Sequence, residues 1–268
     1  MTEYAGRGDA RRSMALLWGR HEPASRGPKQ GLSVERIAAT AVELADEHGL
    51  DAVSMRKIGE RLGTSAMALY TYVPAKTELI DLMLDTALGE LPTAYPLDGG
   101  WRPAAEAWAT AQWDWYQRHP WVLQISVARA LLGPHELDSY EAQLRMFDGI
   151  GLTGPEMNWV VGSLASFVAG AATALAHARA AEQVTGQSED DWWYERSALL
   201  TEMGPSDWEE RYPTQMKLAA EHAFDQTHRR PGDASGYMER EALDNFEFGL
   251  ARLLDGIEAY VARRAGTG

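Results

Sequence analysis

Apolar side chains recur at the 3.6-residue period of an α-helix along most of this chain, and this pattern limits what the chain can fold into. Ile37, Ala41 and Ala45 lie on one such stripe, and Ile80 and Leu84 lie on another. No segment alternates apolar and polar residues for long enough to predict a β-strand. The chain is therefore predicted to be all-α.

Hydroxyl, glycine and proline residues divide the first part of the chain into short helices. Ser33, Ser54 and Ser65 can each cap a helix, and Gly63 and Pro74 end the second and third helices. Two short helices around a glycine-containing turn are typical of a helix-turn-helix motif. A fourth helix is predicted from residue 77. Beyond a Pro- and Gly-rich boundary at 92–100, helices are predicted at 101–118, 120–132, 134–150, 155–183, 191–203, 207–228 and 238–264.

Charge is divided unevenly along the 268-residue chain, whose net charge is −14. Residues 1–80 hold 11 Lys and Arg against 10 Asp and Glu, whereas the remaining residues hold 14 against 29. Because phosphate contacts need cations, only the near-neutral N-terminal region is expected to approach nucleic acid. The chain has no cysteine, which excludes thiol nucleophiles, disulfides and cysteine-ligated zinc.

Three regions are predicted from these patterns. Residues 1–31 lack periodicity and are expected to form a flexible basic arm, 32–78 a helix-turn-helix domain, and 79–268 a larger helical domain entered through a connecting helix at 79–91. The apolar region at 159–178 is interrupted by glycine and polar residues, so it is predicted to be a buried helix and not a membrane span. No secretory signal is expected, and the predicted location is the cytoplasm.

The segment SMRKIGERLGTSAMALYTYVPAK at 54–76, followed by Glu78-Leu79-Ile80, closely resembles the DNA-binding domain of tetracycline-repressor-like regulators. The similarity lies in the hydroxyl residue that opens the second helix, the Leu-Gly turn, the Leu-Tyr-x-Tyr-Val run and the lysine that follows. It covers about residues 32–90, and the remainder resembles the family's ligand-binding and dimerising domain only in helix layout and length. The resemblance implies a ligand-responsive transcriptional repressor that binds a palindromic operator as a homodimer and is released by a small-molecule inducer.

The resemblance also assigns roles within the DNA-binding region. Positions that match phosphate-holding residues are Ser54, Tyr70, Tyr72 and Lys76, and positions at or near base edges are Arg56, Ala66, Met67, Ala68 and Thr71. Ser65, which caps the predicted recognition helix, belongs to the same set. Arg26 and Lys29 of the arm are placed to enter the minor groove, although a solvated tail explains them equally well. Packing between helices is the alternative for the two tyrosines, and an unpartnered surface side chain is the alternative for Lys76.

A small-molecule site is expected among the body helices. Matching the helix layout to the family places these residues near the inducer site: Trp108, Gln112, Gln143, Phe147 and Trp159. Ordinary core packing is the alternative for each aromatic residue, and a surface position is the alternative for each glutamine. The aromatic composition favours a hydrophobic or aromatic inducer. Ser126 stands where the family's best-known member has a metal-binding histidine, so no metal and no cofactor are predicted.

The predicted dimer interface is formed by the helices at 155–183 and 238–264, although their apolar stripes also fit one chain's internal core. The sequence Gly149-Ile-Gly-Leu-Thr-Gly154 matches a dinucleotide-binding pattern by letter, but no strand precedes it. No catalytic motif is present, so we predict that the chain is not an enzyme. A helical small-molecule-binding or scaffold protein without DNA binding remains the second interpretation, and the sequence does not separate a repressor from an activator.

Overall fold

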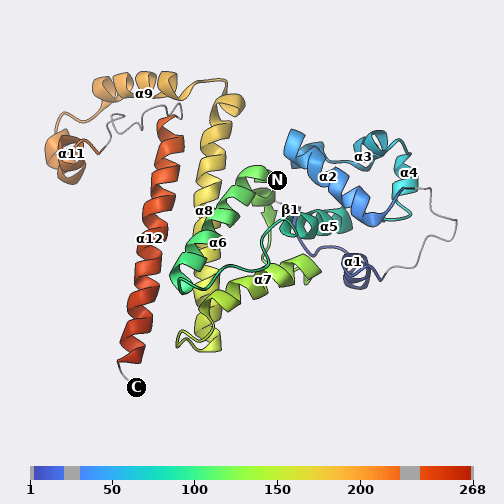
Figure 1. Ribbon diagram of the computed structural model, residues 1–268. Coiled ribbons are helices and arrows are strands. Elements are labelled where there is room, and N and C mark those ends of the chain that lie inside the picture. The colour runs from blue at the N-terminus through green and yellow to red at the C-terminus, as the bar shows by residue number, and fades with distance from the viewer. Residues whose placement is uncertain (1–2, 21–30, 224–235, 267–268) are drawn as a thin grey trace. The chain divides into compact units, whose positions relative to one another are not determined.

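The computed structural model describes residues 3–20, 31–223 and 236–266, and it divides into two compact units. Unit 1 comprises residues 1–173 and 248–268, and unit 2 comprises 174–247. Within the described residues the architecture is all-α apart from two short strands, as Figure 1 shows. The first helices are α1 (Ala10–Leu17), α2 (Val34–His48), α3 (Met55–Leu62), α4 (Ala66–Leu69) and α5 (Lys76–Leu88). The later helices are α6 (Trp101–Arg118), α7 (Pro134–Phe147), α8 (Gly154–Thr185), α9 (Glu189–Met203), α10 (Trp208–Arg211), α11 (Pro213–Ala220) and α12 (Tyr237–Ala265).

Serine caps begin α2, α3 and α4, as the sequence predicts. The hydroxyl oxygens of Ser33, Ser54 and Ser65 each accept a hydrogen bond from a backbone N–H three residues later, at 3.2, 3.3 and 3.3 Å. A one-turn 3-10 helix at Leu50–Ala52 joins α2 to α3. The core of this region holds side chains with no measurable exposure: Ile37, Ile58, Leu69 and Val73. We call residues 32–88, which contain α2 to α5, the head.

The N-terminal residues are packed rather than extended into solvent, so the prediction of an unpacked arm is wrong for residues 3–20. Strand β1 (Glu3–Tyr4) pairs in parallel with β2 (Ile125–Ser126), and α1 buries Leu16 and Leu17. No local pattern could predict a strand whose partner lies more than a hundred residues away in the sequence. Residues 21–30, which include Arg26 and Lys29, lie outside the described residues.

A buried carboxylate holds this N-terminal segment to α5. The backbone N–H of Gly6 donates to Asp81 at 2.8 Å, and the hydroxyl of Ser13 donates to the other carboxylate oxygen at 3.1 Å. Burial raises the pKa of Asp81, while these two hydrogen bonds act in the opposite direction. The segment thus contacts both the last helix of the head and, through β2, the helical region that follows it.

Three predicted helices differ from the observed elements. The segment predicted as a helix at 120–132 forms a 3-10 helix at Pro120–Gln124 and then β2, because its backbone pairs with β1. The helix predicted at 207–228 is interrupted at Tyr212, since Pro213 disfavours a helical residue before it and starts α11. The third predicted helix, α4, ends at Leu69, several residues before Pro74, which was expected to end it.

Helix α8 is more exposed than predicted. Only 28% of its most apolar window is buried, and Trp159 is 66% exposed, so the prediction of a buried helix is wrong for the isolated chain. By length and composition alone, α8 is also the one helix within the described residues that could cross a membrane. The core helix of a soluble protein passes the same test.

Within unit 1, ion pairs join the last helix to earlier ones. Arg102 of α6 contacts Asp255 at 2.7 Å and Glu258 at 3.0 Å on α12. The hydroxyl of Tyr260 donates to Glu156 near the start of α8 at 2.5 Å. Two long helices, α8 and α12, are thereby connected near their ends, as Figure 1 lets the reader follow.

Unit 2 holds the exposed helices α9, α10 and α11, none of which has a buried residue. The rings of Trp192 and Trp193 meet edge to face at 4.8 Å, and Trp193 meets Tyr237 in the same way at 6.2 Å. Glu189 accepts the backbone N–H of Met238 at 2.8 Å. Contacts between exposed aromatic rings and this helix-end hydrogen bond therefore join α9 to the start of α12.

Candidate nucleic-acid interface

The turn between α3 and α4 depends on two glycines. Gly63 ends α3 in the left-handed conformation with φ +65°, which side chains with a Cβ disfavour. At Gly59 an added Cβ would lie 2.7 Å from the carbonyl oxygen of Thr64, closer than real Cβ contacts allow. The two glycines therefore let α4 follow α3 closely, which sets the direction in which α4 presents its exposed face.

Recognition helix α4 shows one face to solvent and one to the core. Met67 is 74% exposed and Tyr70 is 44% exposed, whereas Leu69 is fully buried. Ala66 and Ala68 are half-buried, and Thr71 is exposed with its hydroxyl donating to the carbonyl oxygen of Ala68 at 2.6 Å. Among the predicted base-edge positions on this helix and its end, Met67 and Thr71 are thus the most accessible.

Candidate phosphate-binding groups surround this face. Ser54 and Ser65 use their hydroxyl oxygens as helix caps, which leaves each O–H able to donate to a phosphate. Lys76 is exposed at the start of α5. Tyr72 is half-buried and packs against the head core, which agrees with the packing alternative for this tyrosine more closely than for Tyr70.

Three cations of this region are paired with carboxylates in the isolated chain. Arg56 contacts Glu60 at 2.8 Å, Arg61 contacts Glu47 at 2.6 Å, and Lys76 contacts Glu3 at 3.4 Å. The hydrogen bond from Arg61 lowers the pKa of Glu47. Only the Arg56 and Glu60 pair has a sequence signal, the i, i+4 spacing on one helix. Because these carboxylates compete with phosphates, the region is less positive than its cations alone suggest.

The predicted ligand residues separate into a buried group and an exposed one. Trp108 and Phe147 are 2% and 0% exposed, and Gln112 is also buried, one turn after Trp108 on α6. Gln143 is half-buried and donates to the carbonyl oxygen of Ser139 at 3.1 Å. Trp159 lies on an exposed face of α8, so this chain alone does not bring it together with the buried group.

The buried part of α6 has a polar group without a partner. Within the residues that the structure describes, the indole N–H of Trp108 has no hydrogen-bond acceptor. A buried donor that lacks a partner costs about 1–3 kcal/mol. Such a cost is offset when a ligand or a water supplies the missing acceptor.

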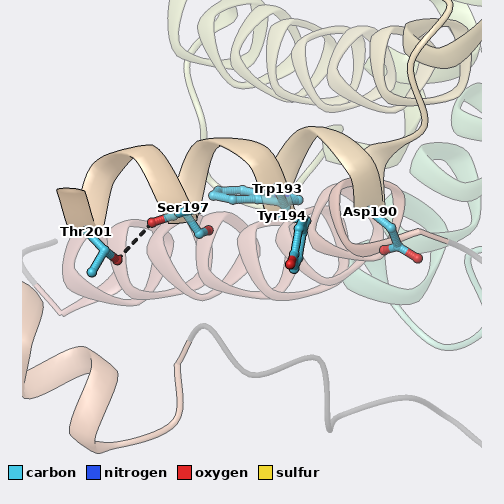
Figure 2. Close-up of a pocket in the computed structure, with 6 residues that line it drawn as sticks. Asp190, Trp193, Tyr194, Ser197 and Thr201 are labelled. Carbon is cyan, nitrogen blue, oxygen red and sulfur yellow. Dashed lines mark hydrogen bonds between the residues drawn. The ribbon is translucent and has the colours of Figure 1, made fainter. Parts of the chain in front are cut away.

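Figure 2 shows a different hollow, of about 490 Å³, along α9. Its lining residues are Asp190, Trp193, Tyr194, Ser197, Ala198 and Thr201. No motif in the sequence predicted this hollow, although the spacing of these residues along one helix face is a signal that could have indicated it. All six are exposed, so the hollow is a surface groove and not an enclosed ligand site.

No metal centre is evident in the described ranges: no three His, Cys, Asp or Glu residues there lie close enough together to hold a metal ion.

Comparisons with known proteins cover both regions of the chain. The family model described as bacterial regulatory proteins, tetR family, matches residues 32–83, and the model described as tetracyclin repressor-like, C-terminal domain, matches 94–261. The chain is 38% identical over 268 residues to the HTH-type transcriptional repressor DrrR1 of Streptomyces coeruleorubidus, covering 99% of this chain and 92% of that protein. An HTH-type transcriptional regulator of Saccharopolyspora erythraea is 31% identical over 158 residues, which are 56% of this chain and 66% of that protein.

Solved structures support the fold. Apo ActR from Streptomyces coelicolor superposes with a TM-score of 0.65 at 22% identity, over 88% of this chain and 99% of that one. ActR in complex with actinorhodin gives a TM-score of 0.66 at 23% identity, over 86% and 97% of the two chains. At this level of identity, the likeness concerns the arrangement of the helices.

Proposed function

Because the chain belongs to the tetR family of bacterial regulatory proteins and is a helix-turn-helix transcriptional repressor, we propose that its homodimer binds a palindromic operator and is released by a small-molecule inducer. The observation that supports operator binding most directly is the exposed face of α4, flanked by hydroxyl and ammonium donors. A single four-residue helix contacts few bases, so two heads on half-sites about 34–36 Å apart are needed for specificity.

Within this proposal, side chains divide by role. Met67 and Thr71 contact base edges, with Arg56 released from Glu60 to pair with a guanine. Tyr70, Lys76 and the capping serines hold phosphates and set the register. Lys76 must separate from Glu3, and Arg56 from Glu60, before these cations can bind DNA. Operator affinity therefore depends on how readily the two ion pairs open.

The exposed faces of α8 and α12 support a homodimer. On α8, Gly162, Ser166 and Gly170 are exposed beyond Trp159, and a second helix can approach these small residues closely. On α12, Phe248 is 65% exposed, with Arg252 stacked over its ring at 5.2 Å. The apolar stripe of α12 is largely internal, since these members are buried within the chain: Phe246, Leu250, Leu254 and Ile257.

The same faces bear on whether α8 contacts lipid. Gly162, Ser163, Ser166 and Gly170 all lie on its exposed side, and hydroxyl-bearing and glycine residues suit a helix partner better than lipid tails. We therefore propose that a second copy of the chain covers α8 and that the protein works in the cytoplasm. The division into residues 32–78 and 79–268 is part of the same proposal.

The inducer site is proposed at the buried face of α6. The indole N–H of Trp108 there lacks a protein partner, and Gln112 is buried one turn further along the helix. Phe147 provides an apolar wall close to Trp101, whose ring centroid is 5.7 Å away. This combination suits a hydrophobic or aromatic molecule that carries a hydrogen-bond acceptor. A scaffold protein without DNA binding is the second candidate, and the sparse polar groups on α4 are the observation in its favour.

Binding to DNA from the gene's own upstream region tests the proposal. The wild-type protein should protect a palindromic site, with affinity that falls steeply as salt rises. Tyr70→Phe and Lys76→Ala should each weaken binding about 5- to 100-fold, because each removes one phosphate donor. Tyr194→Phe and Lys217→Ala, at exposed positions of unit 2, serve as matched controls and should not change affinity. Absence of any salt-sensitive, sequence-preferring binding would favour the scaffold interpretation.

A thermal-shift screen of small aromatic compounds tests the inducer site. Compounds that raise the melting temperature should also release the operator, and both effects should weaken in Trp108→Phe and Gln112→Leu. Trp208→Phe, in a short exposed helix of unit 2, is the control. Compounds that release the operator equally from all variants would place the inducer elsewhere.

A further inference from the structure

His119, at the end of α6, lies between two carboxylates from different parts of unit 1. Its Nδ1 is 2.7 Å from Oδ1 of Asp46 on α2, and its Nε2 is 3.0 Å from Oε2 of Glu90, which follows α5. The side chain of His119 is only 4% exposed. Three segments of the chain that are distant in sequence therefore meet at one imidazole ring.

The geometry requires two donors on that ring. A carboxylate oxygen only accepts hydrogen bonds, whereas a neutral imidazole has a single N–H. A neutral His119 would turn a lone pair of its buried ring toward one of the two carboxylates, whose side chains are 29% and 41% exposed. The imidazolium form satisfies both contacts, so the structure favours the protonated state.

The remaining neighbours fix the cluster in place. Trp121 donates its indole N–H to the same Oδ1 of Asp46 at 2.7 Å, and Arg118 contacts Glu90 at 2.5 Å. The rings of Trp115 and Trp121 meet the imidazole edge to face at 5.7 and 6.1 Å. The charged groups that face or complete the cluster are thus Asp46, Glu90 and Arg118, which balance the imidazolium.

The position of His119 connects the head with the proposed ligand site. Trp108, Gln112, Trp115 and His119 follow one another at spacings of four, three and four residues, so they share one face of α6. Trp115 donates its indole N–H to the carbonyl oxygen of Ala87 on α5 at 2.7 Å. A displacement of α6 therefore reaches α5 through Trp115 and α2 through His119.

We propose that His119 is a positioning residue whose imidazolium holds α2 of the head against the end of α6, so that operator affinity depends on its protonation. The operator part of this inference rests on the proposed function. When the proton is lost, one of the two carboxylate contacts is lost as well, and α2 gains freedom that must be removed again on binding DNA.

The expected pH dependence has a definite sign. Burial lowers the pKa of His119, but the hydrogen bonds and charges of Asp46 and Glu90 outweigh this and raise it above the ordinary value. A histidine with a raised pKa in the folded state contributes its full stabilisation below the unfolded pKa of about 6.5. That contribution is lost as the pH rises through the raised folded pKa.

The first experiment needs no DNA. In the full chain, the ring signals of His119, assigned by comparison with His119→Gln, should titrate with a pKa above the ordinary histidine value of about 6.5. Hydrogen exchange of residues 34–48, corrected for the intrinsic effect of pH, should become faster above that pKa in the wild type and not in His119→Gln. A folded wild type whose His119 is neutral throughout, or whose α2 exchange does not follow the titration, would overturn the proposal.

The second experiment measures operator affinity from pH 6 to pH 9 by fluorescence anisotropy. Relative to His119→Gln, the wild type should lose affinity on the order of tenfold across the His119 titration, as expected for one charge-assisted hydrogen bond. Asp46→Asn keeps an acceptor for the indole N–H of Trp121 but removes one of the charges that raise the pKa of His119. The loss of operator affinity should therefore occur at lower pH in this variant. His48→Gln, at the exposed end of α2, should behave as the wild type does.

These arms also separate the two proposals. Equal pH profiles for wild type and His119→Gln, or a loss in the variant that is the same at every pH, would show a merely structural role and overturn the inference. If the wild type binds no operator at any pH, the proposed function fails, and the ring titration with hydrogen exchange still decides the role of His119. If His119→Gln does not fold, Asp46→Asn supplies the shifted profile.

Discussion

The head and the long helices α8 and α12 differ in how completely their apolar side chains are buried within one chain. In the head, each of α2, α3 and α4 has a serine cap, and the residues at its centre are completely buried within one chain. On α8 and α12, by contrast, Trp159 and Phe248 remain about two-thirds exposed. The comparison shows that the helices of the head bury their apolar side chains within one chain, whereas the long helices leave apolar side chains exposed, on which the proposed homodimer rests.

The largest effect on operator affinity is expected from charged substitutions on the exposed faces of α8 and α12. Trp159→Asp combined with Phe248→Asp places charges where the partner helices would pack, and should lower operator affinity by roughly 100-fold or more, since single heads then bind without avidity. Sedimentation velocity should show a monomer whose helical content is unchanged. Leu200→Asp, on exposed α9, is the control. A variant that stays dimeric would show that these faces are not the interface.

A second test destabilises the head and leaves the long helices unchanged. Gly59→Ala should destabilise the head by about 1–3 kcal/mol, because its Cβ would overlap a backbone oxygen that cannot easily move. Operator affinity should fall while the mass in solution remains that of the dimer. The Cβ that Gly63→Ala adds has no atom within 4 Å, so the cost comes only from the left-handed backbone at this residue. The loss in the free energy of unfolding should therefore be smaller, at about 1–2 kcal/mol. A reversed order of the two variants in thermal unfolding would contradict this account of the turn.

A third test concerns the contact between α6 and α5. Trp115→Phe removes the buried indole N–H and leaves the carbonyl oxygen of Ala87 without this donor, which should cost about 1–3 kcal/mol in the free energy of unfolding. Denaturant unfolding at constant protein concentration provides the measurement. Trp193→Phe, on the exposed groove of α9, should change stability less. An effect that is equally small in both variants would mean that water replaces the lost donor.

The smallest effect is expected at the ion pair between the N-terminal segment and the head. Glu3→Gln should raise operator affinity by about two- to fivefold at low salt, because the ion pair between Lys76 and Glu3 no longer has to open before Lys76 binds a phosphate. The gain should shrink at high salt because screening weakens exposed pairs. Glu209→Gln, on α10, is the control. No change at any salt concentration would indicate that the pair opens freely.

Local sequence signals predicted the head well. Ser33, Ser54, Ser65 and Gly63 marked where its helices begin and end, because capping and left-handed turns involve residues within a few positions of each other. The face of α4 followed from the same spacing. Site roles for these residues stay predictions until binding is measured.

Contacts between distant segments could not be read in this way. The pairing of β1 with β2, the Lys76 and Glu3 ion pair, and the meeting of Asp46, Glu90 and His119 each join residues separated by 29 positions or more. No periodicity encodes such pairs, so residues 3–20 were expected to be unpacked and His119 attracted no prediction.

The sequence by itself determined that this chain is helical, where the head begins, and which family it belongs to, because helix periods, caps and the 54–76 motif are local. Tertiary structure alone decided which cations are already paired, that the Trp108 indole of α6 lacks a partner, and which sides of α8 and α12 remain exposed. The physical reason is that burial and electrostatic pairing depend on what the rest of the fold places next to a residue, and sequence spacing carries that information only over a few helical turns.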